Sequence, residues 1–369
     1  MNWDQIYFAI FLMALVLSLG LTPLFRALAA KTSFYDIPEG EAHKLHRTPT
    51  PLLGGAALCL SWLLTVGIAF AAFKHIPSTA WGESMRNIFS GVGLAGKDFI
   101  IILLCALGAT LLGLRDDRKP MKAHTKFLGQ ILIAGVTAFA CTPQISLFIG
   151  APWIGRLVMM FWILVIFNAI NFLDNMDGLA AGTAGIAMIF FTAAAICNGQ
   201  YFVAALGASL AGSTLGFWFY NHSPASIFMG DSGSHFLGYM LAVLSAKVTY
   251  FDFTTSGSRL NILIPIFILA VPLFDTLAVM AIRIKNHKPI YVGDHNHISH
   301  RFLHMGMTRK QAVLCVHLLE VIAGLGAMPL LWGDTKTCFL LLSQGCVILI
   351  LLSLLQYFGR VKEEKKDEK

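Results

Sequence analysis

Residues 157–178 read LVMMFWILVIFNAINFLDNMDG, an apolar run that ends in a cluster of acids and amides. About 20 mostly apolar residues form a helix long enough to cross about 30 Å of hydrocarbon. Charged side chains are costly inside that layer and stable at its hydrated edge. The stretch therefore predicts a membrane helix with a polar site at one end.

The composition extends this interpretation to the whole chain. Of 369 residues, 56% are hydrophobic and only 13% are charged, about half the charge of a soluble domain. The 28 phenylalanines exclude a disordered chain, and seven cysteines without a CxxC pair argue against zinc and disulfides. The net charge of +7 fits contact with anionic lipid headgroups, so we expect no nucleic-acid partner.

Eleven apolar runs predict an all-α polytopic membrane protein with about eleven transmembrane helices. The fourth and eighth runs are the shortest. We expect one transmembrane domain over residues 1–358 and a charged cytoplasmic tail over 359–369, because no repeat or linker divides the chain. The runs cover approximately 5–29, 52–73, 98–114, 127–141, 154–170, 179–197, 201–219, 235–249, 261–282, 312–331 and 338–358.

The distribution of basic residues predicts the orientation. All but seven of the 27 Lys and Arg residues fall in the connections on one side and in the tail. The exceptions are Lys74, Arg86, Lys97, Arg156, Lys247, Arg259 and Lys336. Cytoplasmic connections carry the basic excess in membrane proteins, so the N-terminus should lie outside and the C-terminus in the cytoplasm.

Acidic residues gather on the same predicted cytoplasmic side. Asp116 and Asp117 end one helix, and Asp174 and Asp177 share a helical face at a spacing of i, i+3. Asp231 lies in a GDSGS string whose small residues let backbone amides approach an anion. Mg²⁺ binds carboxylates together with substrate phosphates. Each motif alone could be a helix cap or a solvated turn, but together they predict a cation and phosphate site.

Histidines and amides complete the predicted site. His297 and His300 are again spaced i, i+3, with Arg301 adjacent, and these groups donate hydrogen bonds to phosphate. Asn168 and Asn171 precede the acids of the central motif. A polar interfacial loop is the alternative for the histidines. The combination suits phosphoryl transfer to a lipid substrate, where catalysis is positioning plus charge neutralisation.

These motifs resemble those of the polyprenyl-phosphate N-acetylhexosamine-1-phosphate transferases. The resemblance is closest to the bacterial undecaprenyl-phosphate GlcNAc-1-phosphate transferase branch of glycosyltransferase family 4, by the string at 272–276 and a final loop similar to the pattern HIHH. Two residues depart from the family pattern. Asn175 replaces the first Gly of Asp-Gly-x-Asp-Gly, where its tolerance of left-handed backbone could preserve the turn, and Ser299 replaces the third position of HIHH. The matching segments are 116–117, 126–130, 168–178, 228–234 and 297–301.

The resemblance implies that UDP-GlcNAc donates GlcNAc-1-phosphate to undecaprenyl phosphate. The products would be undecaprenyl-diphosphate-GlcNAc and UMP, which would initiate a cell-envelope polysaccharide such as lipopolysaccharide at the cytoplasmic face of the bacterial inner membrane. Magnesium is the expected cofactor, with manganese as a substitute, and a homodimer is an open alternative. A MurNAc-pentapeptide-phosphate transferase is the alternative enzyme. A secondary transporter is the alternative class, but it predicts inverted repeats and acids near the midplane.

The resemblance also implies roles for the individual residues. Asp231, assisted by Asp116, would bind the metal, and Asp117 would accept the proton of the lipid phosphate or orient that phosphate; the roles of Asp116 and Asp117 could be exchanged. Asp275 could face the site or join two helices, and His317 with Glu320 is expected to be structural. The predicted catalytic residues are Asp116, Asp117, Asp174 and Asp177, and the predicted substrate-binding residues are Arg47, Lys126, Asn168, Asn171, His297, His300 and Arg301.

Overall fold

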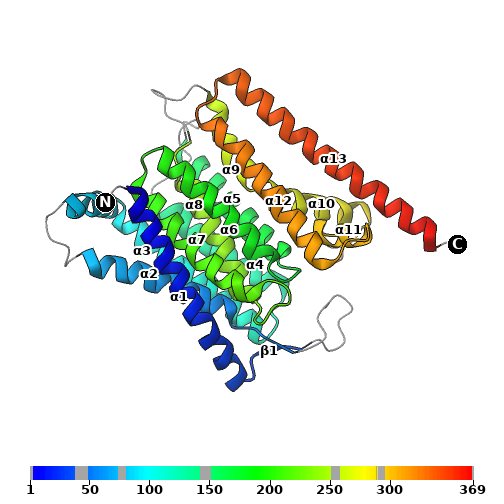
Figure 1. Cartoon of the computed structure of the whole chain (residues 1–369), viewed down its shortest axis with the longest axis horizontal. Helices are drawn as coiled ribbons and strands as arrows, with labels where there is room; N and C mark the ends of the chain where they lie inside the picture. Colours follow the sequence, from blue (N-terminus) through cyan, green and yellow to red (C-terminus); the bar gives the residue numbers. More distant parts are fainter. Residues whose placement is uncertain are drawn as a thin grey trace.

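The computed structural model describes residues 3–37, 49–73, 80–141, 151–250, 258–287, 289 and 296–367. These residues form an almost entirely helical bundle with one two-stranded antiparallel pair, in which Tyr35 lies opposite Pro51 (Figure 1). The elements are α1 (Trp3–Lys31), β1 (Tyr35–Asp36), β2 (Thr50–Pro51), α2 (Gly54–Phe73), α3 (Ala80–Arg118), α4 (Ala123–Ala140), α5 (Pro152–Leu173), α6 (Leu179–Cys197), α7 (Tyr201–Asn221), α8 (Gly230–Lys247), η1 (Arg259–Leu263), α9 (Ile264–Ile268), α10 (Ala270–Lys285), α11 (Ile298–His304), α12 (Arg309–Ala327), η2 (Met328–Leu331) and α13 (Thr335–Asp367).

Every predicted apolar run coincides with a helix or a broken helix, but the predicted count of eleven spans is not reached. Among the described residues, eight helices are long and apolar enough to cross a membrane, or nine if the bent pair 259–268 and 270–285 is one span. The two helices that fall short, α4 and α8, are 18 residues each and begin with polar turns. The chain is therefore a polytopic membrane protein with eight or nine spans by this criterion.

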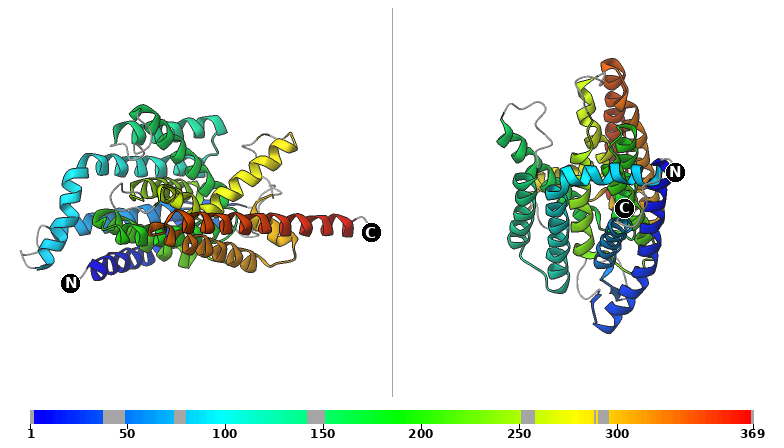
Figure 2. Two further views of the ribbon diagram at one scale, coloured as in Figure 1. Left: turned by 90° about the horizontal axis from the view of Figure 1, so that it is seen from above. Right: turned by 90° about the vertical axis from the view of Figure 1, so that its left-hand side faces the viewer.

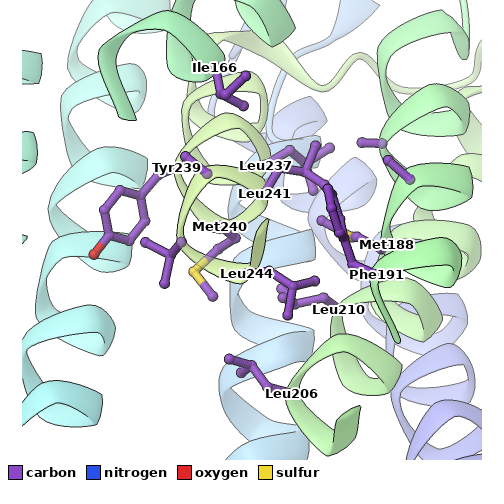
Figure 3. Close-up of a cluster of buried hydrophobic side chains, with 14 of the residues drawn as sticks. Ile166, Met188, Phe191, Leu206, Leu210, Leu237, Tyr239, Met240, Leu241 and Leu244 are labelled. Carbon is purple, nitrogen blue, oxygen red and sulfur yellow. The ribbon is translucent and has the colours of Figure 1, made fainter. Parts of the chain in front are cut away.

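Helix α8 lies in the centre of the bundle, which explains how it can be less apolar than its neighbours. Every residue from Ser232 to Ser245 is buried, and the helix packs against α2, α3, α5, α6 and α7. Figure 3 shows its leucines among Ile166 of α5 and Phe191 of α6. A helix enclosed by protein does not have to present an apolar face to lipid, so polar residues at its start are tolerated.

Helices α1 and α7 approach each other closely through small residues. A Cβ at Gly212 would lie 2.2 Å from the carbonyl oxygen of Phe11, and one at Gly216 would lie 2.7 Å from that of Leu15. The Ser18 hydroxyl donates to the Ser213 carbonyl at 2.7 Å. Small residues four apart allow this backbone contact between membrane helices. The first helix is thereby fixed to the bundle.

The last helices lie outside this packed core. Helix α13 runs along one side of the molecule, and its 335–354 segment is only 11% buried (Figures 1 and 2). Between α9 and α10 the chain bends by 73°. Pro272 cannot donate a hydrogen bond to the carbonyl of Ile268, four residues earlier, which interrupts the helix at this point. The bend directs α10 toward the end of the bundle where the polar motifs meet.

Candidate functional site at the end of the bundle

A polar cavity of about 590 Å³ lies where α3, α5 and α10 end and α6, α8 and α12 begin. Four of the five matching segments line it, namely 116–117, 168–178, 228–234 and 297–301, and Lys126 of the fifth contacts Asp116 and Asp231. Phe228 and Asn221 also border the cavity. The predicted site residues that line it are Asp116, Asp117, Asn171, Asp174, Asp177, Asp231, His297 and His300.

Lys126, in the first turn of α4, connects two carboxylates from different helices. Its Nζ forms an ion pair with Asp231 of α8 and another, at 3.1 Å, with Asp116 Oδ2 of α3. Asn171 Nδ2 donates to Asp231 Oδ1 at 2.7 Å, and the Met121 amide donates to Asp116 Oδ1 at 2.5 Å. Both carboxylates are thus held in place, with one oxygen of each directed at the same cation.

Asp117 holds the N-terminus of α8. Its Oδ1 accepts from the Asp231 amide at 2.7 Å, and its Oδ2 accepts from the Ser232 amide at 3.0 Å. Gly230 turns the chain into the helix at φ +68, and a Cβ there would lie 2.7 Å from the carboxylate. A carboxylate at a helix N-terminus satisfies unpaired amides and stabilises the helix. Asp117 therefore positions Asp231, a contact that the sequence did not predict.

The loop between α5 and α6 forms the acidic wall of the cavity. Asp177 Oδ2 accepts from the Ala225 amide at 3.1 Å. Burial, together with the nearby carboxylates of Asp231, Asp117 and Asp177, raises the pKa of Asp174 to about 8. At neutral pH this carboxyl is therefore largely protonated, and a cation or a basic partner would favour its ionised form.

The side chains of Trp218 and His317 contact the backbone where this loop ends. Gly178 has φ +73, and its carbonyl accepts from Trp218 Nε1 at 3.1 Å. His317 Nε2 lies 3.2 Å from the Leu179 carbonyl, at the start of α6. The structural role predicted for His317 is thus a contact with the end of the acidic loop.

The segment around α11 forms the opposite wall. His297 Nδ1 lies 2.7 Å from Asp275 Oδ2, and the Ile298 amide donates to Asp275 Oδ1 at 2.5 Å. Asp275 of α10 therefore fixes the imidazole of His297, which lines the cavity; Asp275 itself is not among the lining residues and joins α10 to the start of α11. Arg301 is not among the cavity-lining residues; its Nε donates to the Asn296 carbonyl at 2.9 Å.

The structure separates Asn168 from the cavity. Asn168 Nδ2 donates to Gln130 Oε1 and to the Leu164 carbonyl, both at 2.8 Å, and does not line the cavity. It lies about one helical turn from Asn171, where α4 and α5 contact each other. Arg47 lies outside the described residues.

Two arginines that belong to none of the matching segments also line the cavity. Arg283 is 2% exposed, and its guanidinium lies 5.7 Å from the ring centroid of Phe172. Arg309 is the first residue of α12. In the sequence, both residues stand out only as part of the basic excess on the predicted cytoplasmic side. Their position at helix ends beside acidic motifs was the available signal.

Fold and site together define a polytopic membrane protein with a charged cavity suited to phosphates at one end of its bundle. Residues 99–249 match Glycosyl transferase family 4. The chain is 33% identical to the "Probable undecaprenyl-phosphate N-acetylglucosaminyl 1-phosphate transferase" of Bacillus subtilis, over 96% of this chain and 93% of the relative. The chain therefore belongs to glycosyl transferase family 4.

Two further relatives indicate the range of the similarity. The chain is 30% identical to the "Decaprenyl-phosphate N-acetylglucosaminephosphotransferase" of Mycolicibacterium smegmatis, over 86% of this chain and 80% of the relative. It is 29% identical to the "Phospho-N-acetylmuramoyl-pentapeptide-transferase" of Bacillus cytotoxicus, over 63% of this chain and 72% of the relative. The two N-acetylglucosamine enzymes match more of the chain than the muramoyl enzyme does.

Proposed function

We propose that this protein transfers GlcNAc-1-phosphate from UDP-GlcNAc to undecaprenyl phosphate, giving undecaprenyl-diphosphate-GlcNAc and UMP. The observation that carries the proposal is the Asp231, Lys126 and Asp116 cluster on the wall of a cavity that also contains His297 and two arginines. Carboxylates can hold a hard cation, and the basic groups can bind phosphates. The names of the N-acetylglucosamine relatives support this choice of sugar and acceptor.

The donor set at Asp116 and Asp231 fits magnesium. The Lys126 ammonium lies where oxygens of both carboxylates converge, which is the arrangement a cation requires. Mg²⁺ is commonly held by one or two carboxylates, with water and substrate phosphates completing its coordination. Asp116 and Asp231 would hold the ion, and manganese would be an acceptable substitute. When bound, the ion would neutralise charge on the diphosphate and on the departing UMP.

The protein groups have separate tasks in the transfer. An oxygen of the lipid phosphate attacks the β-phosphorus of UDP-GlcNAc, a new P–O bond forms, and the bond to the bridging oxygen breaks as UMP departs. Lys126, His297 and His300 donate to the phosphates, and Asp117 holds α8 so that Asp231 keeps its place. Positioning and charge neutralisation supply most of the rate enhancement in this class of reaction.

We propose that the reaction takes place at the cytoplasmic face of the bacterial inner membrane. The basic residues of the cavity end, including Arg118, Lys119 and Lys122, follow the pattern of cytoplasmic connections. In this position the water-soluble donor enters from the cytoplasm, and the lipid phosphate arrives from the bilayer. The product would begin a cell-envelope polysaccharide.

The test is a reaction with purified protein in detergent, undecaprenyl phosphate, Mg²⁺ and either UDP-GlcNAc or UDP-MurNAc-pentapeptide. We expect UMP and lipid-linked GlcNAc-phosphate with the first donor, and loss of both on chelation and in Asp231→Asn. Asp98→Asn is the matched control and should remain active, because Asp98 lies near the middle of α3 and pairs with Lys247 at the end of α8 opposite the cavity. Product from only the muramoyl donor would replace the sugar, and no product from either donor would refute the transferase.

A further inference from the structure

The two residues that depart from the family pattern are hydrogen-bonded to each other. Asn175 stands where the acidic motif usually has glycine, and Ser299 stands at the third position of the histidine motif. The two are 124 residues apart in the sequence, and the Ser299 hydroxyl donates to Asn175 Oδ1 at 2.6 Å. One departure is thus the direct partner of the other.

Asn175 is not there for its backbone conformation. The described non-glycine residues with positive φ are Ser33 and His287, so Asn175 does not use the left-handed region. Its side chain is instead engaged on both sides, since its Nδ2 donates to the Phe172 carbonyl at 2.9 Å while its Oδ1 accepts from Ser299. The distinctive contribution of Asn175 is therefore its side-chain contacts rather than a left-handed backbone.

The space around Ser299 supports an exchange between the two positions. Ser299 is 0% exposed, so a larger side chain there would have to occupy space that Asn175 now fills. Asparagine and serine together carry as many side-chain heavy atoms as histidine alone, and glycine adds none. Buried exchanges that conserve total volume are tolerated best. Replacement of Asn175 by Gly together with Ser299 by His would therefore conserve the total side-chain volume at this place.

The contact also joins the two walls of the cavity. Asn175 lies in the loop between α5 and α6 with Asp174 and Asp177, while Ser299 lies in α11 between His297 and His300. The hydrogen bond holds the acidic loop against the histidine segment. The family pattern has an imidazole at this position. Here Ser299 has a hydroxyl instead, which donates to Asn175 on the opposite wall.

We propose that Asn175 and Ser299 act as one coupled positioning pair, which fixes the separation of the two cavity walls and thereby the affinity for the diphosphate of the UDP-sugar donor. The proposal rests on the proposed function for the identity of the donor. Asn175 itself borders the cavity, and the pair acts mainly through His297 and His300, which are the phosphate donors of the proposed reaction and whose position Asn175 and Ser299 fix.

The test is a square of four proteins: wild type, Asn175→Gly, Ser299→His and the double variant. Turnover gives kcat and KM, and direct binding of UDP-GlcNAc is measured on the same samples. We expect each single variant to raise KM and the dissociation constant for UDP-GlcNAc about 10-fold. The double variant should return to within about 3-fold of wild type, because the effects of substitutions at contacting residues are not additive. kcat should change less than KM.

Ser299→Ala keeps the test decisive if histidine prevents folding, since it removes the hydroxyl and adds no bulk. It should weaken donor binding in the wild-type background and have no further effect in Asn175→Gly. Ser245→Ala is the matched control, because Ser245 is a buried serine that accepts from Trp162 Nε1 at 2.9 Å in the far half of α8. It should alter thermal stability and leave KM unchanged.

Additive losses in the double variant, or unchanged donor binding in both single variants, would refute the coupling of Asn175 and Ser299. Failure of the wild type to make product while the binding square still shows coupling would refute the transfer reaction and leave the pair standing. Absence of UDP-GlcNAc binding by the wild type would refute both.

Discussion

Helices α3 and α8 run side by side, and aspartate and lysine meet at each end of α8, with opposite results. At the far end Lys247 Nζ lies 2.8 Å from Asp98 Oδ2, and both side chains are at most 15% exposed. At the cavity end the single ammonium of Lys126 is shared by Asp116 and Asp231. Among the contacts given for the described residues, the carboxylate at the far end meets one ammonium and forms a structural tie, whereas the excess of carboxylates at the cavity end gives a site that still attracts cations.

The strongest challenge to this comparison is removal of one carboxylate at each end. We expect Asp231→Asn to lower kcat by about 10³-fold, since it removes a charge that acts on the reacting phosphates. Asp98→Asn should keep kcat within a few-fold of wild type. UMP release at saturating substrates, corrected for the folded fraction, measures both, and equal losses at the two ends would contradict the assignment of roles.

Substitution of the shared lysine should separate metal binding from turnover. Lys126→Met leaves Asp116 and Asp231 without their ammonium, so bound Mg²⁺ should raise the melting temperature of the variant more than that of wild type. Turnover should fall about 100-fold, because a group that neutralises phosphate charge is lost. Thermal shift against Mg²⁺ concentration, beside UMP release, tests both statements. A smaller Mg²⁺ shift in the variant would mean that Lys126 does not compete with the ion.

The far-end pair should affect stability alone. Lys247→Met leaves the Asp98 carboxylate without its 2.8 Å partner and should lower the free energy of unfolding by about 2 kcal/mol. KM for either substrate should stay unchanged, since this pair is at the opposite end of α8 from the cavity. Thermal unfolding in detergent and steady-state kinetics measure the two effects, and a change in KM would connect this end to the site.

The last expected effect is a pH dependence of stability that belongs to the cavity end. The pKa of Asp174 is about 8 against an ordinary value of 3.8, so between these values the folded protein binds more protons than the unfolded chain. Stability of the metal-free protein should therefore fall as pH rises through this window, by at most about 1.4 kcal/mol per pH unit. Asp174→Asn should flatten the profile of melting temperature against pH, and Asp98→Asn should leave its slope unchanged.

The sequence was sufficient to predict which motifs converge, because apolar runs place the ends of alternate helices on one side. It could not predict which side chains face the cavity. Asn168 and Asn171 are one turn apart, but only Asn171 contacts Asp231, and the difference depends on the position of Gln130 in another helix. The contact of Asp117 with α8 likewise depends on how α3 packs against that helix, which no local pattern encodes.

The predicted count of eleven spans is not confirmed, for a related reason. Hydropathy measures how well a helix would dissolve in lipid, whereas α4 and α8 carry Lys126 and Asp231 and are held by other helices. The two helices that look least like membrane spans are thus those that supply the cluster. Polar residues at the start of an otherwise apolar run are the sequence signal for such a helix.

The enclosure of α8 has a consequence for synthesis of the protein. Its partners α2, α3, α5, α6 and α7 all precede it in the chain, so they leave the ribosome before it does. A helix that begins with Gly230, Asp231 and Ser232 partitions poorly into lipid by itself. We therefore expect α8 to enter the bilayer after these helices and to insert by packing against them.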